Sequence, residues 1–269
     1  MMKKRILIPT DFSKNAWNAI AYAADLYKRE EVAFYLVHAY GDSRSKIAKE
    51  KAEKELQKTL QHLEIRTIYS GHTYESLALD LLPLKALKKT IEKYDIELVI
   101  MGTKGQTDAT DVLFGSNTIN AMEKIRNCPV LAVPGNVTYQ EPKEIVFPTS
   151  YKTHYKKREM QYLFEISRIT NAPIRILHVQ EKEILSDTQQ HNKELLEDCL
   201  DGTHFTFHWL ENVNIQEGLM QFVEERKSGM IAFINKKHLF FGSVFSNPLV
   251  KKLGLYSKVP VLALHDFRN

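Results

Sequence analysis

The sequence carries one pattern twice, and this repeat constrains the fold more than any other feature. Short apolar runs alternate with amphipathic segments throughout the 269 residues, which is typical of βα units that build a parallel sheet. Four pairs of motifs recur in the same order: Pro9-Thr10 with Pro148-Thr149, His38 with His178, Gly115-Ser116 with Gly242-Ser243, and Pro129–Ala132 with Pro260–Ala263. Because the order is kept, we interpret the chain as a tandem duplication.

Each half predicts five strands with helices between them. The expected strands of the first half are Arg5–Pro9, Val32–Tyr40, Glu64–Ser70, Glu97–Gly102 and Pro129–Val133. Those of the second half are Glu144–Pro148, Ile174–Val179, His204–Leu210, Met230–Asn235 and Pro260–Leu264. Apolar residues at helical spacing predict helices around 16–27, 48–63 and 77–91, with Pro83 marking a start or a kink in the last. Turn formers from Pro134 to Pro142 predict a linker between domains at 1–138 and 143–269.

Composition narrows the classes of function. Charged residues make up 26% of the chain and the net charge is only +4, with both signs interleaved, so no electrostatic footprint for nucleic acid stands out. The N-terminal apolar stretch stops at Pro9, too early for a secretory leader or a membrane span. We therefore expect a cytoplasmic protein without membrane contact. Cys128 and Cys199 are far apart, which predicts neither a disulfide framework nor a zinc site.

A glycine loop in the first half has the design of a phosphate cradle. The fourth expected strand runs into Gly102 and Gly105, nine residues follow, and Gly115-Ser116 opens a helix. Glycines let the backbone approach a ligand closely, and amides at a helix N-terminus attract anions. Ser116 adds a hydroxyl donor. The alternative is a strand-to-helix loop in which glycine serves only to turn the chain.

Asp11 follows the first expected strand, just ahead of a helix for which Ser13 could be the N-cap. Asp11 could serve only to help start this helix. In a doubly wound sheet of order 3-2-1-4-5, however, strands one and four are neighbours at the switch point where ligands bind. Asp11 and the glycine loop would then face one crevice, with the carboxylate toward ribose hydroxyls or an adenine amine and the loop toward phosphates. This convergence favours a ligand site over either local interpretation.

With these residues in place, the sequence resembles the universal stress protein family. The resemblance rests on Ile8–Ser13, on Leu36-Val37-His38, on the pattern Gly102, Gly105, Gly115 and Ser116, and on Cys128–Val133. It implies two tandem Rossmann-like α/β domains of the adenine nucleotide alpha hydrolase type, each a five-stranded parallel sheet of order 3-2-1-4-5. It also implies a cytoplasmic role in stress tolerance, dimerisation through the last strand, and binding of ATP, or of AMP or ADP, where the glycine pattern is kept.

The resemblance also assigns residues to the ligand. Pro9, Thr10 and Asp11 would contact the base and ribose, Ala39 would pack near the adenine, and Gly102, Gly105, Gly115, Ser116 and Asn117 would hold the ribose and phosphates. Asp108 and Asp111 could approach a magnesium ion carried by the phosphates, although solvated loop acids are the commoner case. No catalytic residue is expected.

The second half departs from this pattern. Ser150 stands where the first half has Asp11, and Asn235 replaces the first glycine. The loop before Gly242 is six residues shorter than its counterpart, which removes up to roughly 20 Å of contour. Its apolar middle, Leu239–Phe241, could fill the crevice instead. We expect this domain to keep the fold and to lack the nucleotide site.

Three classes of function stay open: a nucleotide-binding regulatory or partner-binding protein, a slow ATP hydrolase, and an interaction module without nucleotide. The hydrolase lacks an evident general base. His204 and His208 share a strand face and could bind a metal, but no third ligand is evident. The runs Pro129–Val133 and Pro260–Leu264 would be exposed apolar edges if left alone, so we expect them to pair the halves as a pseudo-dimer. Association of two chains into a homodimer is left open.

Overall fold

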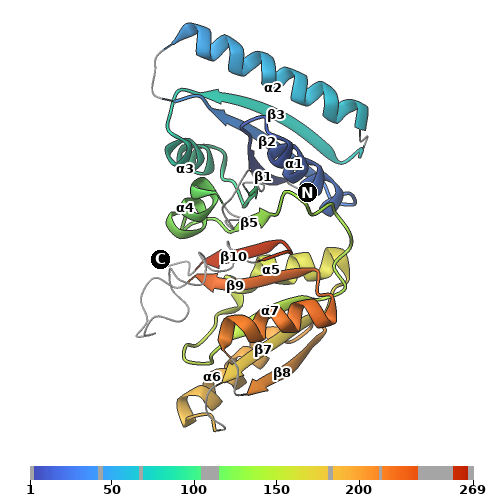
Figure 1. Cartoon of the computed structure of the whole chain (residues 1–269), viewed down its shortest axis with the longest axis vertical. Helices are drawn as coiled ribbons and strands as arrows, with labels where there is room; N and C mark the ends of the chain where they lie inside the picture. The colour runs from blue at the N-terminus through green and yellow to red at the C-terminus, as the bar shows by residue number, and fades with distance from the viewer. Residues whose placement is uncertain are drawn as a thin grey trace. The chain divides into compact units, whose positions relative to one another are not determined.

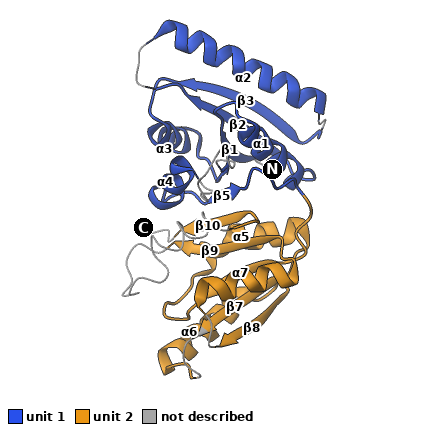
Figure 2. Ribbon diagram, in the orientation of Figure 1, with its two compact units in different colours: residues 1–139 blue, residues 140–269 orange. Residues whose placement is uncertain are grey.

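The computed structural model of the chain describes residues 3–41, 45–66, 69–103, 115–180, 184–211, 214–235 and 257–265. The chain divides into two compact units, residues 1–139 and 140–269 (Figure 2).

The first unit is a parallel sheet in the order β3-β2-β1-β4-β5 with helices in the connections (Figure 1). Its elements are β1 (Lys4–Pro9), α1 (Lys14–Leu26), β2 (Val32–Ala39), α2 (Lys46–Arg66), β3 (His72–Leu79), α3 (Pro83–Tyr94), β4 (Leu98–Gly102), α4 (Ser116–Lys124) and β5 (Val130–Val133). β1 pairs with β2 on one side and with β4 on the other. The carboxyl ends of β1 and β4 therefore meet at the switch point of the sheet.

The second unit repeats this topology in the order β10-β9-β6-β7-β8, again with parallel pairs. Its elements are β6 (Ile145–Thr149), α5 (Lys157–Thr170), β7 (Ile174–Gln180), α6 (Asp187–Leu200), β8 (Phe205–Glu211), α7 (Ile215–Arg226), β9 (Met230–Asn235) and β10 (Val261–His265). Both units thus have the strand order 3-2-1-4-5, which confirms the fold expected from the repeat.

The central strands of the first unit are apolar without interruption because both of their faces are covered. Ile6, Leu7 and Ile8 of β1 are fully buried, and every residue of β5 is buried. On one face α3 packs on β1 and β2 and contacts α4, while α1 packs on β4 and β5. Burial of this kind is the main driving force for folding. It fixes the positions of the carboxyl ends of β1 and β4.

The sequence prediction is wrong for the third strand of the first unit. We expected Glu64–Ser70, but α2 continues to Arg66 and the strand is β3, His72–Leu79. Ile65, which suggested a strand, lies on α2 with 83% of its surface exposed. As an edge strand, β3 exposes alternate residues and carries many polar side chains, which hid it in the sequence.

The helix expected around 77–91 is correspondingly shorter. Pro83 is its first residue and Leu82 its N-cap, so the proline marks a helix start and no kink. Leu77 matched the helical spacing only by coincidence, because it belongs to β3.

Candidate functional site

The turn after β1 brings Asp11 to the carboxyl edge of the sheet. Thr10 Oγ1 accepts a hydrogen bond from the Phe12 amide at 3.0 Å, and Asp11 Oδ1 accepts one from the Ser13 amide at 3.0 Å. Ser13 in turn caps α1, because its Oγ accepts the Ala16 amide at 3.2 Å. The predicted N-cap is thereby confirmed. Asp11 itself stays exposed at the end of the strand.

His38, near the end of β2, contacts this turn twice. Its Nδ1 lies 2.7 Å from the carbonyl oxygen of Thr10, and its ring lies on the ring of Phe12 with the centroids 4.4 Å apart. Because a carbonyl oxygen can only accept, Nδ1 is the donor in this hydrogen bond. Phe12 has a φ of 65°, a left-handed conformation that is unfavourable for a bulky residue.

Helix α4 begins at the same edge. Its N-cap is Gly115, and among the described residues no side chain caps the helix start. Thr118 Oγ1 donates to the carbonyl oxygen of Gly102 at 3.0 Å, which ties the helix start to the end of β4. Uncapped amides and the positive end of the helix dipole attract anions. Gly115 has a φ of −68°, so the backbone conformation itself would accept any residue.

Gly102 is required by packing. A Cβ atom at this position would lie 2.5 Å from the carbonyl oxygen of Asn15 in the first turn of α1. No real Cβ atom approaches an oxygen so closely, so a side chain would force β4 and α1 apart. The sequence suggested that glycine here serves the approach of a ligand, but the close approach of α1 is sufficient reason.

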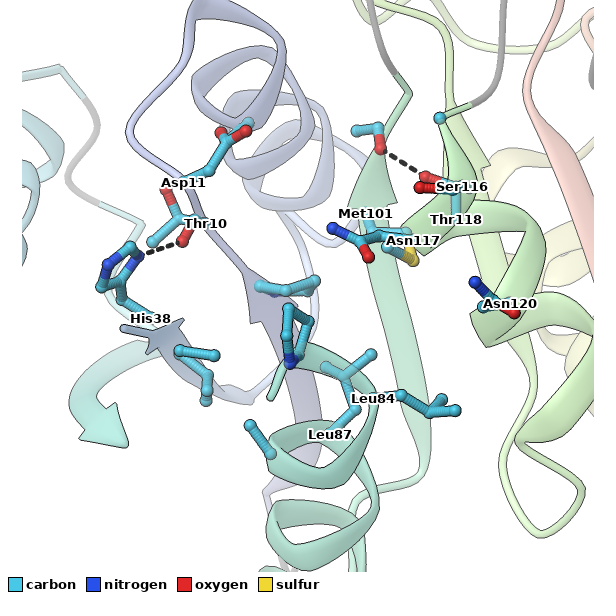
Figure 3. A pocket seen from close by; sticks show the side chains of 18 of the residues that line it. Thr10, Asp11, His38, Leu84, Leu87, Met101, Ser116, Asn117, Thr118 and Asn120 are labelled. Atoms are coloured by element: carbon cyan, nitrogen blue, oxygen red, sulfur yellow. Dashed lines mark hydrogen bonds between the residues drawn. The ribbon is translucent and has the colours of Figure 1, made fainter. Parts of the chain in front are cut away.

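The turn after β1 and the start of α4 border one cavity of about 620 Å³ (Figure 3). Its lining includes eight of the residues that the resemblance assigns to a ligand: Pro9, Thr10, Asp11, Ala39, Gly102, Gly115, Ser116 and Asn117. Gly105 lies outside the described residues, as do Asp108 and Asp111. The fold thus brings together the motif of β1 and the motif of α4, which are about a hundred residues apart in the chain.

Sequence reasoning missed other walls of the cavity. Leu84 and Leu87 of α3 line it, together with Asn120 and Lys124 of α4 and Asn15 of α1. In Figure 3 the side chains of α3 lie between the turn after β1 and the helix α4. The spacing of Asn117, Asn120 and Lys124 places them on one face of a helix. That spacing is the available signal, but only the topology tells which face meets the cavity.

The charges of the lining are few. Asp11 is the carboxylate and Lys124 the ammonium group among the described residues that border the cavity. The remaining polar groups are hydroxyls, amides and the His38 imidazole, and the apolar wall comes from β2, α3 and β4. Such a mixture of apolar walls and a few placed polar groups is usual for small-molecule sites.

The second unit keeps the turn but lacks the acid. Thr149 Oγ1 accepts the Tyr151 amide at 3.0 Å, and His178 Nδ1 lies 2.8 Å from the Thr149 carbonyl oxygen. Tyr151 has a φ of 54° and its ring stacks on His178 with the centroids 4.8 Å apart. Ser150 occupies the position of Asp11, as the sequence states.

Helix α6 covers this second turn. Gln189 Nε2 donates to the Ser150 carbonyl oxygen and Asn192 Nδ2 to the Tyr151 carbonyl oxygen, both at 2.8 Å. Tyr151 is completely buried. Asn235 ends β9 where Gly102 ends β4, and it too is buried. The short loop with Leu239–Phe241 and the glycine after it lie outside the described residues, so their expected role stays a prediction.

Two further features of the described residues are their metal-ligating side chains and the length of their apolar helices. Within the described ranges, no group of three or more His, Cys, Asp or Glu side chains could hold a metal ion. His208 instead shares a hydrogen bond with Thr206, 2.8 Å between Nε2 and Oγ1, and packs on Phe222. In the part of the chain that is described, no helix is long and apolar enough to cross a membrane.

Comparison with known proteins finds sequence similarity over the first unit. Residues 2–134 match the family model of the universal stress protein family. The first unit therefore belongs to the universal stress protein family. Two universal stress proteins of Methanocaldococcus jannaschii are similar to it. One is 27% identical over an alignment of 158 positions that covers 49% of this chain and 96% of the relative. The other is 25% identical over an alignment of 139 positions that covers 48% of this chain and 81% of the relative.

A solved universal stress protein structure extends the likeness to both units. The protein from Archaeoglobus fulgidus aligns over 98% of this chain and 99% of its own, with a TM-score of 0.75 and 18% identity. At that identity the likeness shows the fold alone. The chain therefore has the fold of a two-domain universal stress protein over its whole length.

Proposed function

We propose that the first unit binds one adenine nucleotide of the ATP type, and that the chain is a nucleotide-responsive regulatory protein of the stress response. One observation carries the proposal. A single cavity at the switch point is bordered both by Asp11 and by the uncapped N-terminus of α4. Its volume of about 620 Å³ lies within the range of roughly 300–1,000 Å³ that is usual for small-molecule sites.

The lining divides by chemistry as a nucleotide does. The amides at the start of α4 and the hydroxyl of Ser116 suit the phosphates. The carboxylate of Asp11 suits ribose hydroxyls or the adenine amine, since an ionised acid only accepts hydrogen bonds. Val37, Leu84 and Leu87 supply apolar surface for a base. A magnesium ion carried by the phosphates belongs to the same proposal, with Asp108 and Asp111 as its candidate neighbours.

The proposal includes stoichiometry, because the second unit lacks the acid and the first glycine and has its turn covered by α6. We expect isothermal titration of the full chain with ATP to give one site per chain. Ser150→Ala should leave both the affinity and the stoichiometry unchanged. Mass spectrometry of nucleotide released from freshly purified protein identifies the natural ligand among ATP, ADP and AMP. Two equivalent sites, or no binding of any adenine nucleotide, would contradict the proposal.

The pairing of the two units through Pro129–Val133 and Pro260–Leu264 also stays a proposal. It is supported by the apolar character of both runs, since an apolar strand at a sheet edge needs a cover.

A further inference from the structure

We propose that His38 is a positioning residue of this site, which locks the turn after β1 so that Asp11 is held ready for the nucleotide. The ligand part of this inference rests on the proposed function, whereas the lock rests on geometry alone. In the sequence His38 belongs to a motif that recurs in both halves and to the family resemblance, and neither assigns it a role. Figure 3 shows it beside Thr10, at the cavity end of the first strand.

The turn needs a lock because its conformation is unfavourable in isolation. Phe12 is an aromatic residue with a φ of 65°, and such residues persist only where the surroundings hold them. His38 holds this one from two sides, through the 2.7 Å hydrogen bond to the Thr10 carbonyl oxygen and through the contact of its ring with Phe12. Asp11 lies between the two residues that His38 contacts, so the backbone of Asp11 is fixed at both ends.

The second unit shows which part of this arrangement belongs to the fold. Thr149, Tyr151 and His178 reproduce the same hydrogen bonds, the same ring contact and the same sign of φ. Because this unit has Ser150 in place of the acid, the turn itself does not depend on an acidic side chain at this position. What differs is the acidic side chain that the turn presents in the first unit.

The two turns also differ in what else holds them. In the second unit Gln189 and Asn192 of α6 bond the turn's carbonyl oxygens. Within the described residues 46–66, no side chain of α2 does the same for the turn of the first unit. The turn of the first unit therefore depends on His38 more than its counterpart depends on His178. Asp11 is exposed at the cavity, and His38 bonds the backbone of its turn from the neighbouring strand β2.

A double-mutant cycle tests whether His38 acts through Asp11. We expect His38→Ala to weaken ATP binding by about tenfold in the otherwise unchanged chain, as measured by isothermal titration. In an Asp11→Ala background the same substitution should weaken binding by less than about twofold, because there is no carboxylate left to position. Equal factors in both backgrounds would show that His38 acts independently of Asp11 and overturn the inference.

Two further variants serve as a rescue and as a control. His38→Asn keeps an N–H donor near the position of Nδ1, so it should restore most of the affinity that His38→Ala loses. His178→Ala removes the matching contacts from the second unit and should leave ATP affinity unchanged. The positioning role would be contradicted if His38→Asn bound ATP as weakly as His38→Ala and if His178→Ala lowered the ATP affinity by the same factor.

A measurement without nucleotide tests the lock by itself. The Phe12 amide donates to Thr10 Oγ1 and the Ser13 amide to Asp11 Oδ1. Hydrogen exchange of these two amides should be about tenfold faster in His38→Ala than in the unchanged chain. Unchanged exchange would refute the lock even if ATP binds. If exchange accelerates but no nucleotide binds to the unchanged chain, the proposed function fails and the lock stands.

Discussion

Asp11 combines a local hydrogen bond with the proposed contact to the ligand, and substitution separates the two. Asp11→Ala removes a charge-assisted acceptor, so we expect ATP affinity to fall by about 1.5–3 kcal/mol in isothermal titration. Asp11→Asn keeps an oxygen for the Ser13 amide and should retain the thermal stability of the chain while still losing affinity. Unaltered ATP binding by Asp11→Ala would place the site elsewhere.

The two glycines of the site differ in why they are glycines, and their substitutions should differ accordingly. Gly115→Leu fits the observed φ of −68°, so the fold should survive while the side chain enters the cavity and abolishes ATP binding. Gly102→Ala is the contrast, because its Cβ would collide with the Asn15 carbonyl and lower the free energy of unfolding. Denaturation curves and titrations of both variants check this. Tight binding by Gly115→Leu would contradict it.

Residues close in sequence to a motif could be predicted, while residues brought in by packing could not. Asp11 and Gly115 were found because each follows a recognisable strand or opens a recognisable helix. Asn15, Asn120 and Lys124 border the same cavity, but their place depends on how α1 and α4 are rotated against the sheet. That rotation is set by the buried faces of several elements together, which no local pattern records.

Among the elements of the first unit, the strands buried on both faces were predictable and the edge strand β3 was not. β1, β4 and β5 form continuous apolar runs. β3 has a polar sequence, and the preceding helix extends past the point where a strand was expected. The edge strand β8 of the second unit is as exposed, but aromatic residues alternate along it, and the predicted range differs from the observed one by one residue at each end. The weak pattern of β3, and not its edge position alone, therefore hid it.

Glu144 links three elements of the second unit and makes its stability depend on pH. Burial alone would raise the pKa of this carboxyl group, but hydrogen bonds from Arg226, Arg175 and Ser228 lower the pKa to about 2. Because the folded-state pKa lies below the ordinary 4.5, the stabilisation is present above about pH 4.5 and is lost as the pH falls toward 2.

Glu144→Gln tests this linkage. We expect it to lower the free energy of unfolding by about 1–2 kcal/mol at pH 7, since it replaces charge-assisted hydrogen bonds with neutral ones while water screens the partly exposed Arg226. Urea unfolding at pH 7 and at pH 3 should show the difference between variant and unchanged chain shrinking at the lower pH. Lys258→Gln is a suitable control, because its ion pair with Glu224 is largely exposed and worth little. A difference that is constant with pH would show that Glu144 acts by packing alone.

At the scale of the whole chain, two units share one topology and differ in the chemistry at the switch point. The strand order was predictable from the repeat, because order follows from the sequence of βα units and the handedness of their connections. The cover that α6 forms over the turn of the second unit was not predictable, because it depends on Gln189 and Asn192 reaching carbonyl groups about forty residues away.

The close approach of Gly102 to the carbonyl of Asn15 bears on how the two halves diverged. In the first unit α1 begins at Lys14, four residues after Thr10, whereas in the second α5 begins at Lys157, eight residues after Thr149. The second unit has both this longer connection and Asn235 in place of the glycine. A half with the packing of the first unit would meet a collision on losing its glycine, so selection for folding would oppose that substitution.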